Sequence, residues 1–340
     1  MTSSLRLGGF KVLKDVTLIS LVPPEEMGDL PVRLCRAIAD KKINLPYVSV
    51  IDNGRSRGMH IMLDTANRTS ATRLVDRESA NVTTSISESA ILSIFPYRSN
   101  PIVVGSLLEV FDRQGIDTQS YANSPSAVSA VVKRDLIRKA GHALFDTFTF
   151  SAYRTPEDWS LAQKGKEQLY REVVASYQEK KPKVYGLEIR EGLEFIHIQL
   201  DDGGIGQIGS ALRDLSKRGL NLAFISKNPR RLQGVEDLFI CLPPSSGHPN
   251  AEVMSRMAPE AVIDTIFPAA TFSMNGPHFG DRYGIAVELL HAIKESGVDL
   301  LALNCSIASI IGVVPLDQIQ AAIRAIQGCF EVPSVTQKDA

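Results

Sequence analysis

Four short segments along the chain carry the same signal for the end of a helix and the start of a strand. In each one, an apolar residue follows Gly or Lys and precedes Asn or Asp. The segments are Lys42-Ile43-Asn44-Leu45, Gly115-Ile116-Asp117-Thr118, Gly219-Leu220-Asn221-Leu222 and Gly297-Val298-Asp299-Leu300. Self-similarity of this kind predicts that one small α/β unit is repeated four times along the chain.

A second landmark groups the four units into two pairs. Gly9-Phe10-Lys11-Val12 leads into an alternating apolar run at Val16–Leu21, and Gly186-Leu187-Glu188-Ile189 leads into a similar run at Leu193–Ile198. The differences 186 − 9 and 220 − 43 both equal 177, so both landmarks shift by the same amount. The larger repeating unit is therefore predicted to be a pair, used twice.

Each unit follows the order β-α-β-β-α-β, which is most complete in the second one. Its predicted elements are a strand at 90–95, a helix at 103–114, strands at 116–122 and 127–132, a helix at 135–144 and a strand at 147–152. This order predicts a ferredoxin-like arrangement with two helices on one face of an antiparallel sheet. We expect an α+β fold of four ferredoxin-like βαββαβ modules in two tandem pairs. The module boundaries are 8–81, 82–154, 184–268 and 269–333, with a linker helix over 155–183 and a frayed tail after Val332.

The amino-acid composition argues against nucleic acid and membranes as binding partners. The 37 basic and 38 acidic residues of this 340-residue chain nearly cancel, so no bulk charge favours nucleic acid or a membrane surface. No apolar stretch approaches the roughly 20 residues that span a bilayer, and the first residues lack the apolar core of a signal peptide. The four cysteines are dispersed, as reduced core cysteines often are, which predicts a cytoplasmic location.

Several segments of the last unit resemble the regulatory ACT domains of aspartokinases. They are Tyr283–Leu290, Gly297–Ser306 and Ile310–Pro315, and the resemblance extends more weakly over about residues 8–152 and 184–332. It implies that the four modules are ACT-like. An aspartokinase also carries a kinase domain that opens with a Lys-Phe-Gly-Gly-Thr-Ser type motif, of which only Gly8-Gly9 is present here. The resemblance therefore implies a regulatory region without a kinase domain.

The resemblance also implies where a ligand would bind. ACT domains usually hold small amino acids where the loop after the first strand meets the first helix, because free backbone N–H groups and the helix dipole suit a carboxylate. The matching loops are 25–31, 96–101, 201–206 and 275–284, of which the last two offer the best ligand groups. The candidate ligand-binding residues are Asp201, Asp202, Gly203, Gly204, Ile205, Gly206, Asn221, Asn275, His278, Phe279, Gly280 and Asp281. The alternative is that these glycines and aspartates only form tight turns and helix caps.

The sequence lacks convincing motifs for dinucleotide binding, metal binding or catalysis. Gly204-Ile205-Gly206-Gln207-Ile208-Gly209 matches the dinucleotide pattern G-x-G-x-x-G, but the following strand ends at Lys227 without an acidic residue for a ribose. The six histidines show no metal-ligand spacing with one another or with cysteine, and His197 fits a half-buried position in a strand. We expect no catalytic residue, no cofactor and no metal site.

These observations favour a non-catalytic, amino-acid-binding regulatory protein resembling the aspartokinase regulatory region. Its expected partners are an amino-acid effector and a biosynthetic enzyme, and a homodimer stays open. The alternative is an enzyme, or an enzyme subunit of the aspartate kinase family that needs a separate catalytic chain. A third reading is a scaffold whose ligand loops are closed. Fold alone does not decide among the three.

Overall fold

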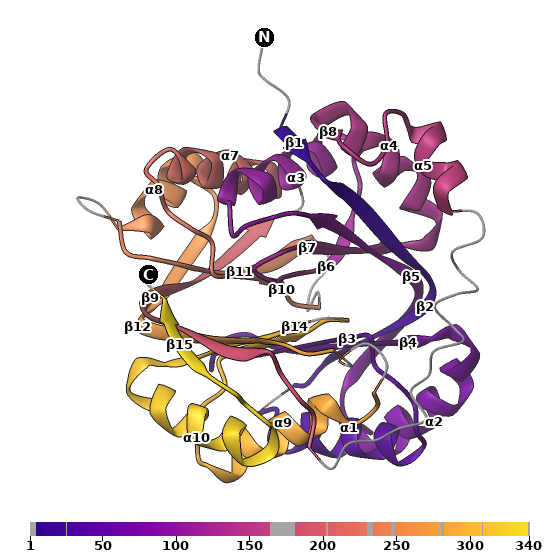
Figure 1. Cartoon of the computed structure of the whole chain (residues 1–340), viewed down its shortest axis with the longest axis vertical. Helices are drawn as coiled ribbons and strands as arrows, with labels where there is room; N and C mark the ends of the chain where they lie inside the picture. Colours follow the sequence, from indigo (N-terminus) through magenta and orange to yellow (C-terminus); the bar gives the residue numbers. More distant parts are fainter. Residues whose placement is uncertain are drawn as a thin grey trace.

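The computed structural model describes residues 5–24, 26–163, 181–201, 203–229, 234–245, 249–277, 279, 282–307 and 309–338. It is an α+β fold built on one large, mostly antiparallel sheet (Figure 1). Within these ranges no helix combines the length and the apolar character needed to cross a bilayer.

Within the described residues, the first half of the chain contains eight strands and five α-helices. In chain order they are β1 (Leu5–Leu7), β2 (Gly9–Val22), α1 (Leu30–Asp40), β3 (Tyr47–Asp52), β4 (Arg57–Asp64), α2 (Arg68–Glu78), β5 (Thr83–Phe95), α3 (Pro101–Arg113), β6 (Thr118–Asn123), β7 (Val128–Lys133), α4 (Ile137–Thr147), β8 (Phe148–Phe150) and α5 (Pro156–Gln163).

The second half largely repeats this order. It contains β9 (Gly186–Asp201), α7 (Ile205–Ser216), β10 (Phe224–Lys227), β11 (Val235–Leu242), α8 (Asn250–Met257), β12 (Val262–Asn275), α9 (Ile285–Glu295), β13 (Ala302–Cys305), β14 (Ser309–Pro315), α10 (Ile319–Cys329) and β15 (Val335–Lys338).

Four long strands carry the sheet from one layer into the other. The strand order is β10-β11-β9-β12-β14-β13-β3-β4-β2-β5-β7-β6, with β15 added beside β9. β2 pairs with β5 along almost its whole length, with an irregularity between Leu13 and Val16, and β9 pairs with β12 with an irregularity between Ile266 and Ala269. Bulges increase the local bend and twist of a strand. The sheet therefore folds over on itself at these places.

The result has two sheet layers inside and helices outside. In Figure 1, α3, α4, α5, α7 and α8 cover one layer, and α1, α2, α9 and α10 cover the other. One large apolar cluster lies under each group of helices, and two smaller clusters lie on the other faces of the strands. The smaller clusters include Phe195, Phe224 and Phe239 in one, and Tyr47 and Met62 in the other.

The two halves of the chain meet at two interfaces formed by strands and helices, and also through polar contacts such as Ser49 with Ser226 and Ser56 with Asp237. At the first interface, β3 pairs with β13 through backbone hydrogen bonds and α1 packs against α9. At the second interface, α3 packs against α7, and β6 lies beside β10. Side chains bridge these two strands, since Asn123 donates to the Ala223 carbonyl at 3.1 Å and accepts from the Ile225 N–H at 2.9 Å.

The repeated helix-end signals have a common backbone basis. Lys42, Gly115, Gly219 and Gly297 all have positive φ, at 56°, 57°, 79° and 65°. A left-handed residue just past the last turn is a common way to end a helix. The signal therefore marks four helix ends, those of α1, α3, α7 and α9.

Other expectations differ from the structure. The strand predicted at 90–95 begins at Thr83, and the tail that we expected to be frayed contains β15, which pairs in parallel with Leu187–Arg190 of β9. The first part of the predicted linker helix is α5, whose Trp159 is buried against Gly141, while residues 164–180 lie outside the described residues. The division into four modules stays a proposal, because β12 runs across the boundary placed at 268/269.

Candidate functional site

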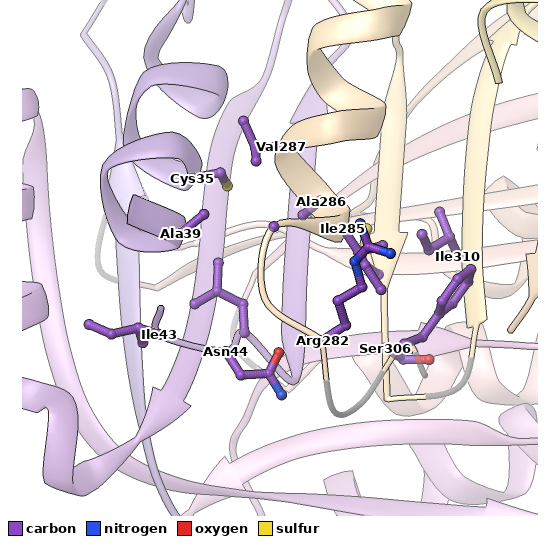
Figure 2. A pocket seen from close by; sticks show the side chains of 14 residues that line it. Cys35, Ala39, Ile43, Asn44, Arg282, Ile285, Ala286, Val287, Ser306 and Ile310 are labelled. Atoms are coloured by element: carbon purple, nitrogen blue, oxygen red, sulfur yellow. The ribbon is translucent and has the colours of Figure 1, made fainter. Parts of the chain in front are cut away.

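A pocket lies at the first interface, between α1 and the beginning of α9 (Figure 2). Cys35 and Ala39 line it from α1, and Ile43 and Asn44 line it from the segment that follows. The other half of the chain contributes the following residues: Phe279, Arg282, Gly284, Ile285, Ala286, Val287, Cys305, Ser306 and Ile310. Both halves of the chain are therefore needed to form this pocket.

The pocket has an apolar wall and a few polar groups. Figure 2 shows Asn44 on the side of α1 and Arg282 on the side of α9. The Arg282 side chain is only 12% exposed and forms an ion pair with Glu288 at 3.1 Å. Burial raises the pKa of the Glu288 carboxyl, and the positive charge of Arg282 opposes that shift. The guanidinium thus already interacts with one carboxylate at the edge of the pocket.

The start of α9 adds backbone donors to the same place. The first N–H groups of a helix have no acceptor within the helix. The N-cap residue immediately before α9 is Gly284, with φ of +89°, and it has no side chain that could cap these N–H groups. The positive end of the helix dipole therefore points toward the pocket.

The pocket is small as it stands. Its enclosed space is about 20 Å³, which is close to the room that one water molecule needs. Cys35 and Cys305 are buried in its wall, and burial raises the pKa of the Cys35 thiol to about 12 and that of Cys305 further. Both side chains therefore act as small apolar groups at neutral pH.

The predicted residues of the fourth loop are only partly in this pocket. Phe279 lines it, is 5% exposed and packs edge-on against Phe330. Asn275 is the last residue of β12, and its carbonyl accepts a hydrogen bond from the Tyr185 N–H at 2.9 Å. His278, Gly280 and Asp281 lie outside the described residues.

The third loop forms a tight turn into α7. Gly203 has φ of +89°, and the Gly204 N–H donates to the Asp201 carbonyl at 3.0 Å. Asp201 is exposed, Ile205 is buried, and Asp202 lies outside the described residues. Asn221 is exposed and precedes β10 rather than opening it.

The glycines of the G-x-G-x-x-G match pack helices together. A Cβ on Gly209 would lie 2.6 Å from the Gly105 carbonyl oxygen of α3, and a Cβ on Gly206 would lie 2.5 Å from Asp112 Oδ2. The α3 backbone leaves no room for a side chain at Gly209, whereas at Gly206 the close atoms belong to the Asp112 side chain. These contacts give the glycines a structural role and leave no argument for a dinucleotide.

Cys35, Asn44, Arg282 and Ser306 line the pocket but were not among the candidate ligand-binding residues, although Arg282 lies within the predicted loop 275–284. Asn44 belongs to the repeated helix-end signal and corresponds there to Asn221, so the signal itself could have identified it. His197 is a half-buried sheet residue, as predicted, with its Nε2 atom 2.6 Å from Asp237. No group of three or more His, Cys, Asp or Glu side chains placed to hold a metal ion occurs in the described ranges.

Comparison with known proteins gives a structural likeness and no sequence match. No family model and no curated protein matches the chain. The aspartate kinase from Synechocystis matches with a TM-score of 0.74 and 17% identity over 95% of this chain. The chain spans 56% of the length of that kinase. The ligand-free regulatory subunit of aspartate kinase from Thermus thermophilus covers 42% of this chain, with 16% identity and a TM-score of 0.38.

The first match corrects one expectation. We expected a non-catalytic regulatory protein, and this expectation is contradicted because almost the entire chain shares its fold with an aspartate kinase, which is an enzyme. The alternative, an enzyme subunit, agrees better with this match. The structural neighbours of this chain are aspartate kinases and their regulatory subunits.

Proposed function

We propose that this chain is an enzyme subunit of the aspartate kinase family that works together with a separate catalytic chain. One observation carries the proposal, namely the likeness over 95% of this chain to the Synechocystis aspartate kinase. The match covers 56% of that enzyme, and we propose that a separate chain supplies the part that the match leaves out. In this role the separate chain supplies phosphoryl transfer from ATP to aspartate.

The contribution of this chain is the pocket at the first interface, which we propose as a site for a small amino acid. The guanidinium of Arg282 and the positive end of α9 both favour a carboxylate at the same place. The walls formed by Cys35, Ala39 and Ile310 favour a compact side chain.

Because the pocket is small, binding of an amino acid would require α1 and α9 to change their relative positions. An amino acid does not fit in about 20 Å³, so its entry requires α1 and α9 to move apart. A ligand that binds one arrangement better than another shifts the population toward that arrangement. Since α1 and α9 come from different halves of the chain, binding would alter how the halves sit against each other. A cytoplasmic location completes the proposal, in keeping with four unpaired cysteines.

The experiment combines this chain with the aspartate kinase catalytic chain of the same organism, produced separately. Aspartyl phosphate is measured as its hydroxamate for each chain alone and for the mixture, and complex formation is followed by size-exclusion chromatography. We expect no turnover by this chain alone, a complex with the catalytic chain, and a changed rate in that complex. The absence of both a complex and a rate change would refute the proposal.

The pocket is tested separately by thermal shift against the twenty amino acids. We expect one or a few of them to raise the Tm of the chain, and Arg282→Ala to abolish the shift. The control is Arg256→Ala, which removes an exposed arginine from α8, a helix that covers the sheet layer opposite to the one under α1 and α9 (Figure 1). If Arg282→Ala keeps the full response, the ligand binds elsewhere.

A further inference from the structure

The second interface differs from the first in how closely its helices approach. A Cβ on Gly105 would lie 2.4 Å from the Gly209 carbonyl oxygen, and the reverse distance is 2.6 Å. The backbones of α3 and α7 therefore touch where these helices cross. At the first interface, by contrast, the corresponding helices α1 and α9 enclose a pocket.

An acidic side chain of α3 lies against the beginning of α7. The Asp112 carboxylate reaches the first turn of α7, where its Oδ2 atom lies 2.5 Å from the point that a Cβ on Gly206 would occupy, and the Gly206 N–H lowers the pKa of this carboxyl. The α7 helix begins after Gly204, which offers no side-chain cap of its own. The carboxylate thus lies beside the N–H groups that a helix leaves without an acceptor.

The other surroundings of Asp112 disfavour the charged form of its carboxyl. Asp112 is the second-to-last residue of α3, where the negative end of the helix dipole repels an anion. Burial and the nearby charge of Glu236 both raise the pKa of its carboxyl, and only the Gly206 N–H acts in the opposite direction. The negative charge of Asp112 is therefore stabilised by α7, on the other side of the interface, and not by α3 itself.

A second acid one turn earlier in α3 strengthens the same contact. Glu109 accepts hydrogen bonds from the Ser210 hydroxyl and from Arg213, both at 2.7 Å. Both partners belong to α7. The α3 helix thus presents two carboxylates to α7, and Asp112 is the one placed at the positive end of its dipole.

We propose that Asp112 is an internal ligand of α7, which takes the place of a free carboxylate and keeps the second interface closed without any effector. A response to small molecules is then confined to the first interface. This proposal does not depend on the enzyme subunit proposed above, because it concerns a contact within the chain.

The test is rescue of Asp112→Ala by acetate. Thermal unfolding of the full chain is measured in sodium acetate and in sodium chloride at equal ionic strength and pH. We expect the variant to unfold about 2–4 °C below the unsubstituted chain in chloride, and acetate to restore part of this loss in a saturable way. The unsubstituted chain should show no acetate effect.

The matched control is Asp214→Ala, which removes an exposed acid from α7 that pairs with Lys217. Acetate should not raise the Tm of this control relative to chloride. The proposal is wrong if Asp112→Ala unfolds at the same temperature as the unsubstituted chain. It is also wrong if acetate raises the Tm of Asp112→Ala no more than that of the control.

A second variant checks that the contact exists in solution. Gly206→Ala should lower the Tm of the unsubstituted chain, because its Cβ would meet Asp112 Oδ2 at 2.5 Å. The same substitution should be close to neutral in the Asp112→Ala background, since alanine favours helix over glycine. Equal effects in the two backgrounds would contradict the proposed contact.

Discussion

The hydroxyls of Ser49 and Ser226 hydrogen-bond to each other at 3.0 Å, and these residues are 177 positions apart. The same shift relates Gly9 to Gly186 and Ile43 to Leu220. Contact between two equivalent residues is what a two-fold axis between equivalent units produces. The serine pair therefore supports the proposal that the two halves of the chain are repeats related by such an axis.

Removing one serine of this pair should lower the free energy of unfolding by more than the hydrogen bond itself contributes. Both side chains are buried, so Ser49→Ala leaves the Ser226 hydroxyl with one partner fewer, at a cost of about 1–3 kcal/mol. Replacing both serines should cost less than the sum of the single changes. Urea unfolding measures all three variants, with Ser70→Ala, on the exposed face of α2, as control. Strict additivity would show that the pair does not interact.

The crossing of α3 and α7 predicts opposite effects of the same substitution at two helical glycines. Gly209→Ala should destabilise the chain by about 1–3 kcal/mol, because the added methyl group overpacks against Gly105. Gly328→Ala in α10 meets no atom within 4 Å and should be neutral or stabilising by up to about 1 kcal/mol. The free energy of unfolding of both variants checks this. Equal effects would mean that the helices are further apart in solution.

His60 predicts a loss of stability in mild acid. Burial, and then the positive charge of Lys227, lower its pKa to about 3 from 6.5, while its Nδ1 atom lies 2.8 Å from the Ser20 hydroxyl. Between these pH values the unfolded chain binds a proton that the folded chain does not, so stability falls as the pH falls.

The stability of the unsubstituted chain should therefore drop below pH 6.5 by up to about 1.4 kcal/mol per pH unit more than that of His60→Gln. Urea unfolding at several pH values measures the difference between the two slopes. His142→Gln, at an exposed site on α4, should keep the slope of the unsubstituted chain. Parallel slopes for His60→Gln and the unsubstituted chain would show that His60 is protonated in the folded state.

The buried ion pair of Lys227 and Glu236 predicts a strong effect that a second substitution relieves. Lys227 is 1% exposed, and its Nζ atom lies 2.7 Å from Glu236 and 2.6 Å from the Thr118 carbonyl oxygen. Lys227→Met leaves a buried carboxylate without this cation and should cost about 3–5 kcal/mol. Adding Glu236→Gln should recover a large part of this loss. Denaturant unfolding of the single and double variants tests it, and a further loss in the double variant would contradict it.

The helices could be predicted from the sequence because their signals are local. The apolar residues of α3 and the left-handed glycine after it, Gly115, lie within one stretch of chain, and the predicted helix at 103–114 agrees with α3 to within two residues at each end. The same holds for α1, where Lys42 adopts the left-handed conformation.

The full strands could not be predicted, because part of each long strand is polar. The first half of β5, Thr83-Thr84-Ser85-Ile86-Ser87-Glu88, has little apolar alternation and is held by its pairing with β2. This pairing joins residues about seventy positions apart, and nothing in the local pattern indicates it. β15 is wholly exposed and was missed for the same reason.

The ligand site in the loop before α9 stays a prediction. This loop contributes Phe279 to the pocket wall, and the pairing of β3 with β13 brings Asn44 and Arg282 to the same pocket. The pairing of these two strands cannot be predicted from a single sequence. The third loop was chosen for its glycines, and the structure shows Gly206 against Asp112 of a helix nearly a hundred residues earlier.

The long strands β2, β5, β9 and β12 determine how far this protein can be divided. A fragment that ends between β4 and β5 exposes an unpaired edge along the whole of β2, and unpaired edges promote aggregation. A fragment that ends between α8 and β12 does the same to β9. A piece of this chain that keeps its long strands paired must therefore contain both β2 and β5, or both β9 and β12.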